Sequence, residues 1–92
     1  MHLTQKQLSQ LLIEAKQKIT IGGAYRHYKS SQMTYIVKDI AINEADNGPC
    51  VIYQALYGNQ ITFIRPVKEW LETLQTGDKT VQRYAAIYDK AD

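Results

Sequence analysis

The spacing of apolar residues changes once along this chain, at Gly22-Gly23, and that change limits what the 92 residues can fold into. Before the two glycines, apolar residues recur at steps of three and four, as on one face of an α-helix. After them, apolar and polar residues alternate, as in β-strands. We therefore expect an N-terminal helical extension over residues 1–21 and a β-rich domain over residues 22–92, packed together as one globular unit.

The sequence also marks where the helix begins and ends. Thr4 and Gln7 have the spacing of a capping box, in which each side chain accepts a hydrogen bond from the backbone N–H of the other residue. The β-branched run before Gly22 should end the helix. An apolar stripe on one face predicts that the helix packs on the rest of the chain. The stripe consists of Leu8, Leu11, Leu12, Ala15 and Ile19.

Five strands are expected in the β-rich part, over residues 25–29, 34–43, 50–57, 60–65 and 80–88. The alternation in the second of these slips near Asp39, which indicates a bulge or a bend. Gly58-Asn59 fits a two-residue type II′ loop, so the third and fourth strands should pair antiparallel.

A short helix is expected before the last strand. Pro66 suits the first turn of a helix, because proline has no N–H to leave unbonded there. The helical spacing of Trp70, Leu71 and Leu74 predicts a buried helical face. The order of elements predicts a mainly β fold: a five-stranded SH3-like barrel with an added N-terminal α-helix and a short helix before the last strand.

Composition excludes several classes of protein. Cys50 is the single cysteine, so no disulfide forms within the chain, and His2 and His27 are too few to complete a zinc site with it. No metal and no cofactor are expected. The apolar runs are far shorter than the roughly 20 residues of a membrane-spanning helix, and the N-terminus lacks the apolar centre of a signal peptide. We therefore expect a cytoplasmic protein with no membrane partner.

Four segments of the chain together resemble a known family. They are residues 23–29 (Gly-Ala-Tyr-Arg-His-Tyr-Lys), residues 53–58 (Tyr-Gln-Ala-Leu-Tyr-Gly), Ile64-Arg65-Pro66 and Arg83-Tyr84. In this order and spacing they resemble a family of small bacterial proteins known as domain of unknown function 1653, over about residues 22–88. The resemblance implies an SH3-type β-barrel in a bacterial protein, and it implies no activity. The N-terminal helix, Ser30-Ser31 and Phe63-Ile64 depart from the family pattern.

The densest polar and aromatic cluster is Tyr25-Arg26-His27-Tyr28-Lys29. On a strand, Arg26 and Tyr28 point to one face and the other three to the opposite face. One interpretation is a binding face, with guanidinium and imidazole groups for an anion and tyrosine rings for stacking. The other is structural: the tyrosines close the core with their hydroxyls in water, and Arg26 pairs with an acidic neighbour.

Two more arginines allow a similar choice. Arg65 precedes the short helix, where it can bind an anion or pair with Glu69 or Glu72. Arg83 on the last strand allows the same two interpretations. If Arg26, Arg65 and Arg83 converge, their charges need a shared acidic partner or a bound anion.

Three functions remain open from the sequence. The first is a non-catalytic binding module for a peptide or protein partner, for which Tyr53 and Tyr57 would form a shallow aromatic groove. The second is binding of RNA or single-stranded DNA, for which a net charge of +2 is small. The third is a small enzyme acting on an anionic metabolite through His27, although no nucleophile stands in a recognisable relation to it. The candidate binding residues are Tyr25, Arg26, His27, Tyr28, Lys29, Tyr53, Tyr57, Arg65 and Arg83. The sequence leaves the oligomeric state open.

Overall fold

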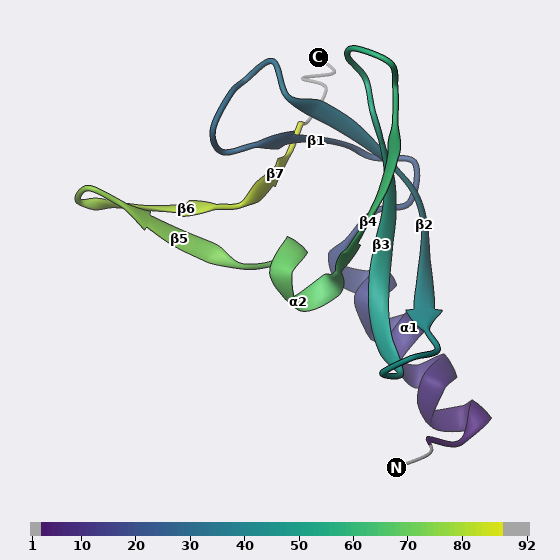
Figure 1. Ribbon diagram of the computed structural model, residues 1–92. Helices are drawn as coiled ribbons and strands as arrows, with labels where there is room; N and C mark the ends of the chain where they lie inside the picture. Colours follow the sequence, from purple (N-terminus) through teal and green to yellow (C-terminus); the bar gives the residue numbers. More distant parts are fainter. Residues whose placement is uncertain (1–2, 88–92) are drawn as a thin grey trace, which may run out of the picture.

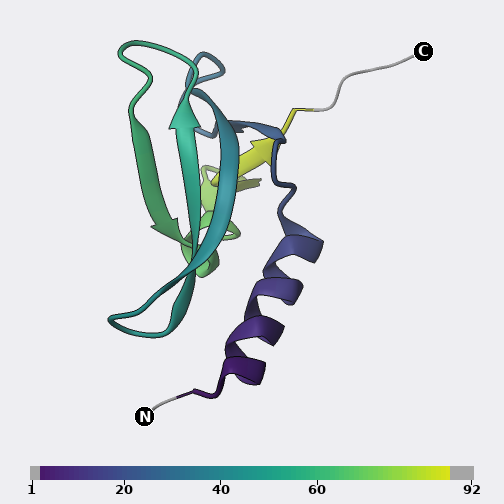
Figure 2. The same ribbon diagram turned by 90° about the vertical axis from the view of Figure 1, so that its right-hand side faces the viewer.

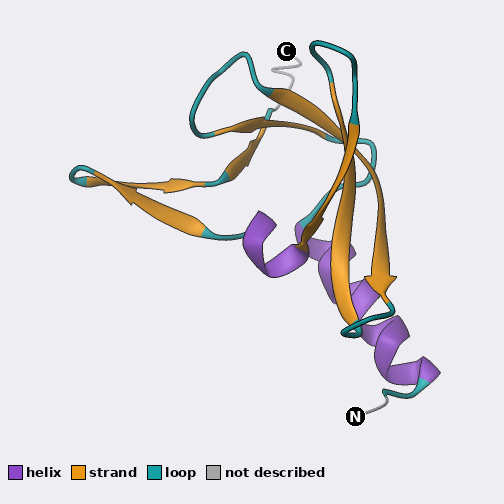
Figure 3. Cartoon of the chain, in the orientation of Figure 1, coloured by secondary structure: helices purple, strands orange, loops and turns teal. Residues whose placement is uncertain are grey.

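The computed structural model describes residues 3–87 (Figure 1). His2 lies outside the described residues, and so do residues 88–92, which include the end of the strand expected over residues 80–88. The elements are α1 (Gln5–Lys18), β1 (Ala24–His27), β2 (Thr34–Asn43), β3 (Gly48–Ala55), β4 (Thr62–Pro66), α2 (Val67–Trp70), β5 (Thr73–Thr76), β6 (Lys79–Gln82) and β7 (Tyr84–Ala86). Figure 3 shows that strands predominate, with one long helix at the N-terminal end.

The helix α1 begins and ends where the sequence predicts. The Thr4 side chain accepts a hydrogen bond from Gln7 N–H at 3.1 Å, and Gln7 Oε1 accepts one from Thr4 N–H at 2.8 Å. The helix stops at Lys18, because Ile19 already has an extended backbone. Ala15 and Ile19 are buried, and α1 lies beside the sheet rather than inside it (Figure 2).

Five strands form one antiparallel sheet in the order β4-β3-β2-β1-β7. The pairing of β2 with β3 shifts between Val37 and Asp39, which confirms the bulge. Within residues 3–87 no pairing joins β7 to β4, so the sheet is not closed and an SH3-like barrel is not confirmed. The mainly β fold with an N-terminal helix is confirmed.

The segment between β4 and β7 differs most from the prediction. The helix α2 is a single turn, Leu71 is 39% exposed and Leu74 belongs to β5, so only Trp70 of the expected helical face is in the core.

The strand expected over residues 80–88 is divided into β6 and β7. β6 pairs with β5 in a separate hairpin, whose turn at Gly77 has φ +65°. A positive φ is accessible to glycine without steric cost.

The β3–β4 connection is longer than the two-residue loop that the sequence predicts. The antiparallel pairing itself is confirmed, but the strands end at Ala55 and begin again at Thr62. Ala55 N–H donates to the Ile61 carbonyl at 3.0 Å, and Gly58 and Gln60 both have positive φ. The wider loop allows the Tyr57 side chain to reach back to Tyr35 on β2.

The core lies on one face of the sheet and is rich in aromatic residues. Val51 and Trp70 are 0% and 1% exposed, and the other members come from α1, α2 and every strand of the main sheet except β4. They are Ala15, Ile19, Tyr25, Tyr35, Val37, Ile40, Tyr53, Ala55, Val67 and Tyr84. No helix among the described residues has the length and apolar character needed to cross a membrane.

Candidate binding site

The candidate site is built on a cluster of aromatic rings around Trp70. The Trp70 and Tyr84 rings stack in parallel, with centroids 3.8 Å apart and planes 4° apart. Tyr25 and Tyr53 meet Trp70 edge to face at 5.3 Å and 4.8 Å. Edge-to-face and stacked pairs are favourable arrangements of aromatic quadrupoles, so these rings hold one another in fixed orientations.

Four tyrosine hydroxyls at this site form two pairs. The Tyr35 and Tyr57 hydroxyl oxygens are 2.7 Å apart, and those of Tyr53 and Tyr84 are 3.3 Å apart. Burial raises the pKa of Tyr35 and of Tyr84, and the hydrogen bonds to Tyr57 and Tyr53 raise the two pKa values further. The two buried hydroxyls therefore stay protonated well above neutral pH.

Arg65 and Arg83 both lie beside Tyr84, and each forms an ion pair. Arg65 Nη1 is 3.0 Å from Glu69 Oε1, and its guanidinium carbon is 5.8 Å from the centre of the Tyr84 ring. Arg83 Nη2 is 2.6 Å from Glu72 Oε1. The Nε atoms of both arginines are buried and have no hydrogen-bond partner among the described residues.

His27 lies between these arginines and the tyrosines. Its side chain is 8% exposed, its Nδ1 accepts a hydrogen bond from Lys29 N–H at 3.2 Å, and its ring packs against Tyr28 and Tyr84. Burial lowers the pKa of His27, and the positive charges of Arg83, Lys29 and Arg65 lower it further. His27 is therefore neutral at neutral pH.

The structure brings together only part of the predicted set. The positive charges of Arg65 and Arg83 both lower the pKa of His27. Arg26, in contrast, is exposed between two buried residues of β1 and so points to the face of the sheet opposite to His27. There it borders a hollow of about 510 Å³ between β1 and β6, which His27 and Tyr28 also border. Lys29 is exposed just beyond β1.

Two residues of the candidate site were missed from the sequence. Tyr35 lies opposite Ala55 in the β2–β3 ladder, on the same face as Tyr53, and the alternation of Tyr35 with Val37 was the signal that could have placed it. Phe63 lies opposite Tyr53 on β4, with the rings 5.7 Å apart, and it is 40% exposed.

We use the term aromatic-basic surface for the half-exposed side chains that surround the tyrosines on this face. Its members are Tyr57, Phe63 and Arg65, which lie against Tyr35, Tyr53 and Tyr84 respectively. It borders β4, which pairs only with β3 and is an edge of the sheet. No charged residue occurs from Ala55 to Ile64, although Ile61 and Ile64 are 55% and 62% exposed.

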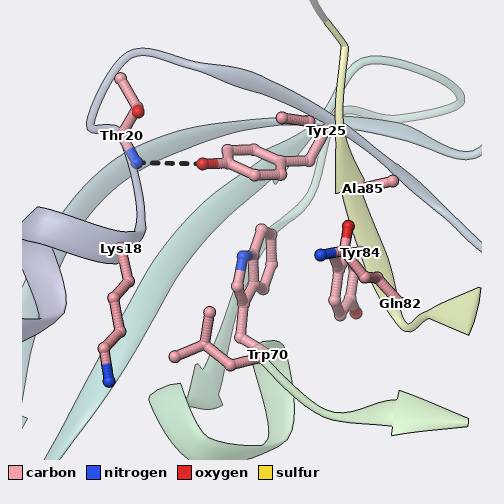
Figure 4. A pocket seen from close by; sticks show the side chains of 9 residues that line it. Lys18, Thr20, Tyr25, Trp70, Gln82, Tyr84 and Ala85 are labelled. Atoms are coloured by element: carbon pink, nitrogen blue, oxygen red, sulfur yellow. Dashed lines mark hydrogen bonds between the residues drawn. The ribbon is translucent and has the colours of Figure 1, made fainter.

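A pocket of about 220 Å³ lies on another side of the same ring stack (Figure 4). Trp70 and Tyr84 form part of its wall, and Tyr25 lies at its inner end, where the Tyr25 hydroxyl accepts a hydrogen bond from Thr20 N–H at 2.9 Å. Lys18 at the end of α1 and Gln82 at the end of β6 stand at its sides. The pocket therefore joins the helical extension to the sheet and the hairpin.

Comparison with known proteins places the chain in a family. Residues 23–86 match the family described as "Protein of unknown function (DUF1653)". The chain belongs to the DUF1653 family. The match runs from β1 to β7, so the aromatic-basic surface lies entirely within the DUF1653 region, whereas α1 precedes it.

A solved DUF1653 structure has a similar fold. It is a crystal structure of a family member from Bordetella bronchiseptica, 27% identical in sequence, with a TM-score of 0.64 over 77% of this chain and 91% of that one. Comparison with curated proteins found no match.

Proposed function

We propose that this DUF1653 chain is a non-catalytic binding module that holds an extended, carboxylate-bearing peptide segment of a partner protein. The observation that supports this function most directly is the position of the aromatic-basic surface beside an unpaired sheet edge. An extended peptide bound at such an edge gains main-chain hydrogen bonds from the strand and side-chain contacts from the face.

The edge strand β4 has the properties of a strand that accepts a partner. Sheet edges are usually protected by charges or by proline, because their free N–H and C=O groups pair readily with other chains. In β4 the charged residue and the proline come only at the end, as Arg65-Pro66, after the uncharged sequence Thr62-Phe63-Ile64. Phe63 on the inner face and Ile64 on the outer face would contact alternate side chains of an added strand.

The arginines favour a carboxylate on the peptide. Arg65 and Arg83 each bind one glutamate that is itself about half exposed, with 44% and 46% of the Glu69 and Glu72 side chains accessible. Exposed ion pairs of this kind contribute only about 0–1 kcal/mol. A peptide carboxylate that is partly shielded by Phe63 and Tyr57 would therefore compete well for the same guanidinium groups.

The strand order also supports an SH3-like arrangement of the main sheet, as a finer description of the fold. Five strands form the main sheet, and the β2 bulge is the kind of irregularity that bends a sheet at a barrel corner. The helical turn α2 comes before the last strand, although the β5–β6 hairpin lies between them. We propose a partly open barrel whose uncovered side carries the aromatic-basic surface.

Nucleic-acid binding is the weaker candidate, because its basic groups are divided. Arg26 lies on the opposite face from Arg65, and Arg65 and Arg83 are already paired with glutamates, which disfavours a continuous basic stripe. A catalytic role for His27 is weaker still, since its Nδ1 is already bonded and its ring is buried.

Titration of the ¹⁵N-labelled protein tests the proposal. The probe is a synthetic octapeptide of alternating valine and threonine with one central glutamate, and the comparison peptide has lysine in that place. We expect backbone shifts over residues 61–65 with the glutamate peptide and weaker binding of the lysine peptide. Arg65→Gln should weaken binding of the glutamate peptide, and Arg26→Gln should not.

The same titration with single-stranded DNA and RNA at two salt concentrations separates the candidates. Salt-sensitive shifts with the nucleic acids and none with the peptides would replace the proposed function with nucleic-acid binding. Equal binding of the two peptides would remove the role of the arginines. Shifts in the β4 amides that depend only on protein concentration would instead identify a second copy of the chain as the occupant.

A further inference from the structure

The pocket between α1, α2 and the β6–β7 segment presents hydrogen-bond donors that lack acceptors. Trp70 is 1% exposed, and Figure 4 shows its indole nitrogen on the pocket side of the ring, facing the region of Thr20 and Tyr25. Indole N–H is a donor only, and buried tryptophan usually finds a partner for it. Trp70 Nε1 is not one of the buried nitrogens without a partner among residues 3–87, so its N–H is open to solvent in the pocket and can donate to a ligand there.

A second donor points into the same space. The Tyr25 hydroxyl accepts the Thr20 N–H at 2.9 Å, so its oxygen is held in place and its own proton is left to donate. The Thr20 bond is the one hydrogen bond of this hydroxyl among the described residues. The Gln82 amide group stands opposite the Trp70 ring in Figure 4 and adds N–H groups that can turn to a ligand.

The charge around the pocket indicates the class of ligand. Lys18 is the one charged side chain among the residues that line it, and no aspartate or glutamate is among them. An anion is therefore favoured. A single charge is favoured over two, because the pocket lies beside the C-terminal end of α1, where the helix dipole is negative and Lys18 offsets it.

The remaining wall favours an aliphatic body on that anion. Leu71, Ala85 and Ala86 contribute apolar atoms, and the Trp70 and Tyr84 rings add more. Trp70 cannot turn its N–H away, because its ring is stacked on Tyr84 at 3.8 Å and held by Tyr25 and Tyr53 at its edges. The donors are thus fixed before a ligand arrives, which reduces the entropy lost on binding.

We propose that this pocket binds a small aliphatic monocarboxylate, whose carboxylate accepts hydrogen bonds from Trp70 Nε1 and the Tyr25 hydroxyl while Lys18 supplies the opposite charge at the rim. This proposal does not depend on the peptide-binding function. It uses a different side of the Trp70–Tyr84 stack and residues of α1 that lie outside the DUF1653 match.

Trp70 is the single tryptophan of the chain, so its fluorescence reports directly on the pocket. The full chain is titrated with butyrate, and with butyramide, phosphate and chloride at matched ionic strength. We expect a saturable change with butyrate and a much weaker response to butyramide, which has the same shape without the charge. No saturable change with butyrate, equal responses to butyrate and butyramide, or a stronger response to phosphate would each overturn the proposal.

Two lysine variants give the matched comparison. Lys18→Gln removes the charge at the rim, and Lys16→Gln removes an equivalent charge from the same last turn of α1 without touching the pocket. We expect Lys18→Gln to weaken butyrate binding about two- to five-fold, as for loss of an exposed charge pair. Equal weakening by both variants would show a general charge effect and would contradict the proposal.

Loss of the indole donor is tested by calorimetry, because that variant no longer fluoresces at the pocket. Trp70→Phe keeps an aromatic ring and removes the N–H. We expect weaker butyrate binding and an unchanged fold, checked by the dispersion of the amide spectrum. Unchanged butyrate affinity in folded Trp70→Phe would contradict the assigned donor.

Discussion

Trp70 and Tyr84 stack face to face at 3.8 Å, and this contact connects α2 with β7. Trp70 ends the single turn of α2, and Tyr84 begins β7, a three-residue strand that pairs only with β1. The aromatic-basic surface lies on one side of the stack and the pocket on another. Both proposed sites therefore depend on this pair of rings.

Replacing Trp70 should cost much of the stability of the fold. We expect Trp70→Ala to lower the free energy of unfolding by about 3–5 kcal/mol, because it leaves a cavity among three aromatic neighbours, Tyr25, Tyr53 and Tyr84. Urea denaturation measures the loss. Trp70→Phe, which should lose less, provides a value if the alanine variant does not fold.

Leu71→Ala is the matched control for that loss. Leu71 is the next residue along the chain but is 39% exposed, so its truncation should cost under about 1 kcal/mol. A loss as large as that of Trp70→Ala would show that the helical face predicted from the sequence is buried after all.

Stability should fall in alkaline solution because of the buried tyrosines. In the folded chain the pKa of Tyr35 is raised above 10.0, its ordinary value, by burial and by the Tyr57 hydroxyl. The unfolded chain therefore loses this proton first as the pH rises. The stability that depends on the protonated hydroxyl is complete below pH 10 and declines above it.

Urea midpoints measured between pH 8 and pH 11 test this expectation. The decline should be shallower in Tyr35→Phe, which has no proton to lose there, and unchanged in Tyr28→Phe, whose ring is outside the hydroxyl pairs. An identical alkaline decline in all three proteins would assign it to other groups.

Stability should also fall in mildly acidic solution because of His27. Its folded-state pKa lies below the usual 6.5, first because of burial and then because of Arg83. The unfolded chain takes up the proton first as the pH falls, so the stability is present above pH 6.5 and is lost below it. His27→Gln should remove this acid dependence, and NMR titration of the imidazole should give a midpoint below 6.5. A midpoint at or above 6.5 contradicts the prediction.

The capping box should contribute measurably to α1. We expect Thr4→Ala to cost about 1 kcal/mol, because it leaves the Gln7 N–H without its acceptor. Hydrogen exchange at the Gln7 and Leu8 amides should accelerate. Lys6→Ala in the same turn removes no cap and should leave exchange unchanged, and equal acceleration by both changes would mean that the cap contributes nothing.

Local signals in the sequence were sufficient for some elements and not for others. The capping box and the β2 bulge depend on a few neighbouring residues, and each was predicted at its place. The β5–β6 hairpin was missed because Leu74 and Val81 meet only through the pairing of two four-residue strands. The helical spacing of Trp70 and Leu74 indicated a helix in the place of β5.

The site was harder to predict than the fold, because it depends on which face each side chain occupies. The pairing of Arg65 with Glu69 joins residues four apart in the sequence, and it was one of the interpretations left open for Arg65. The separation of Arg26 from Arg65 depends on strand order and phase across the whole sheet, and neighbouring residues do not determine it. The same holds for Tyr35 and Phe63, which join the site only through their partners across the ladder.

The hairpin of β5 and β6 projects from the body of the molecule, and Figure 1 shows its tip far from the main sheet. Its base is closed by the Arg83 N–H bond to the Glu72 carbonyl at 2.9 Å, so both ends of the arm lie together. Its tip at Gly77-Asp78 is thus a natural place to insert a foreign sequence, such as an affinity tag or a fluorescent label. A probe placed there would be carried by the molecule without altering the sheet, the ring stack or either proposed site.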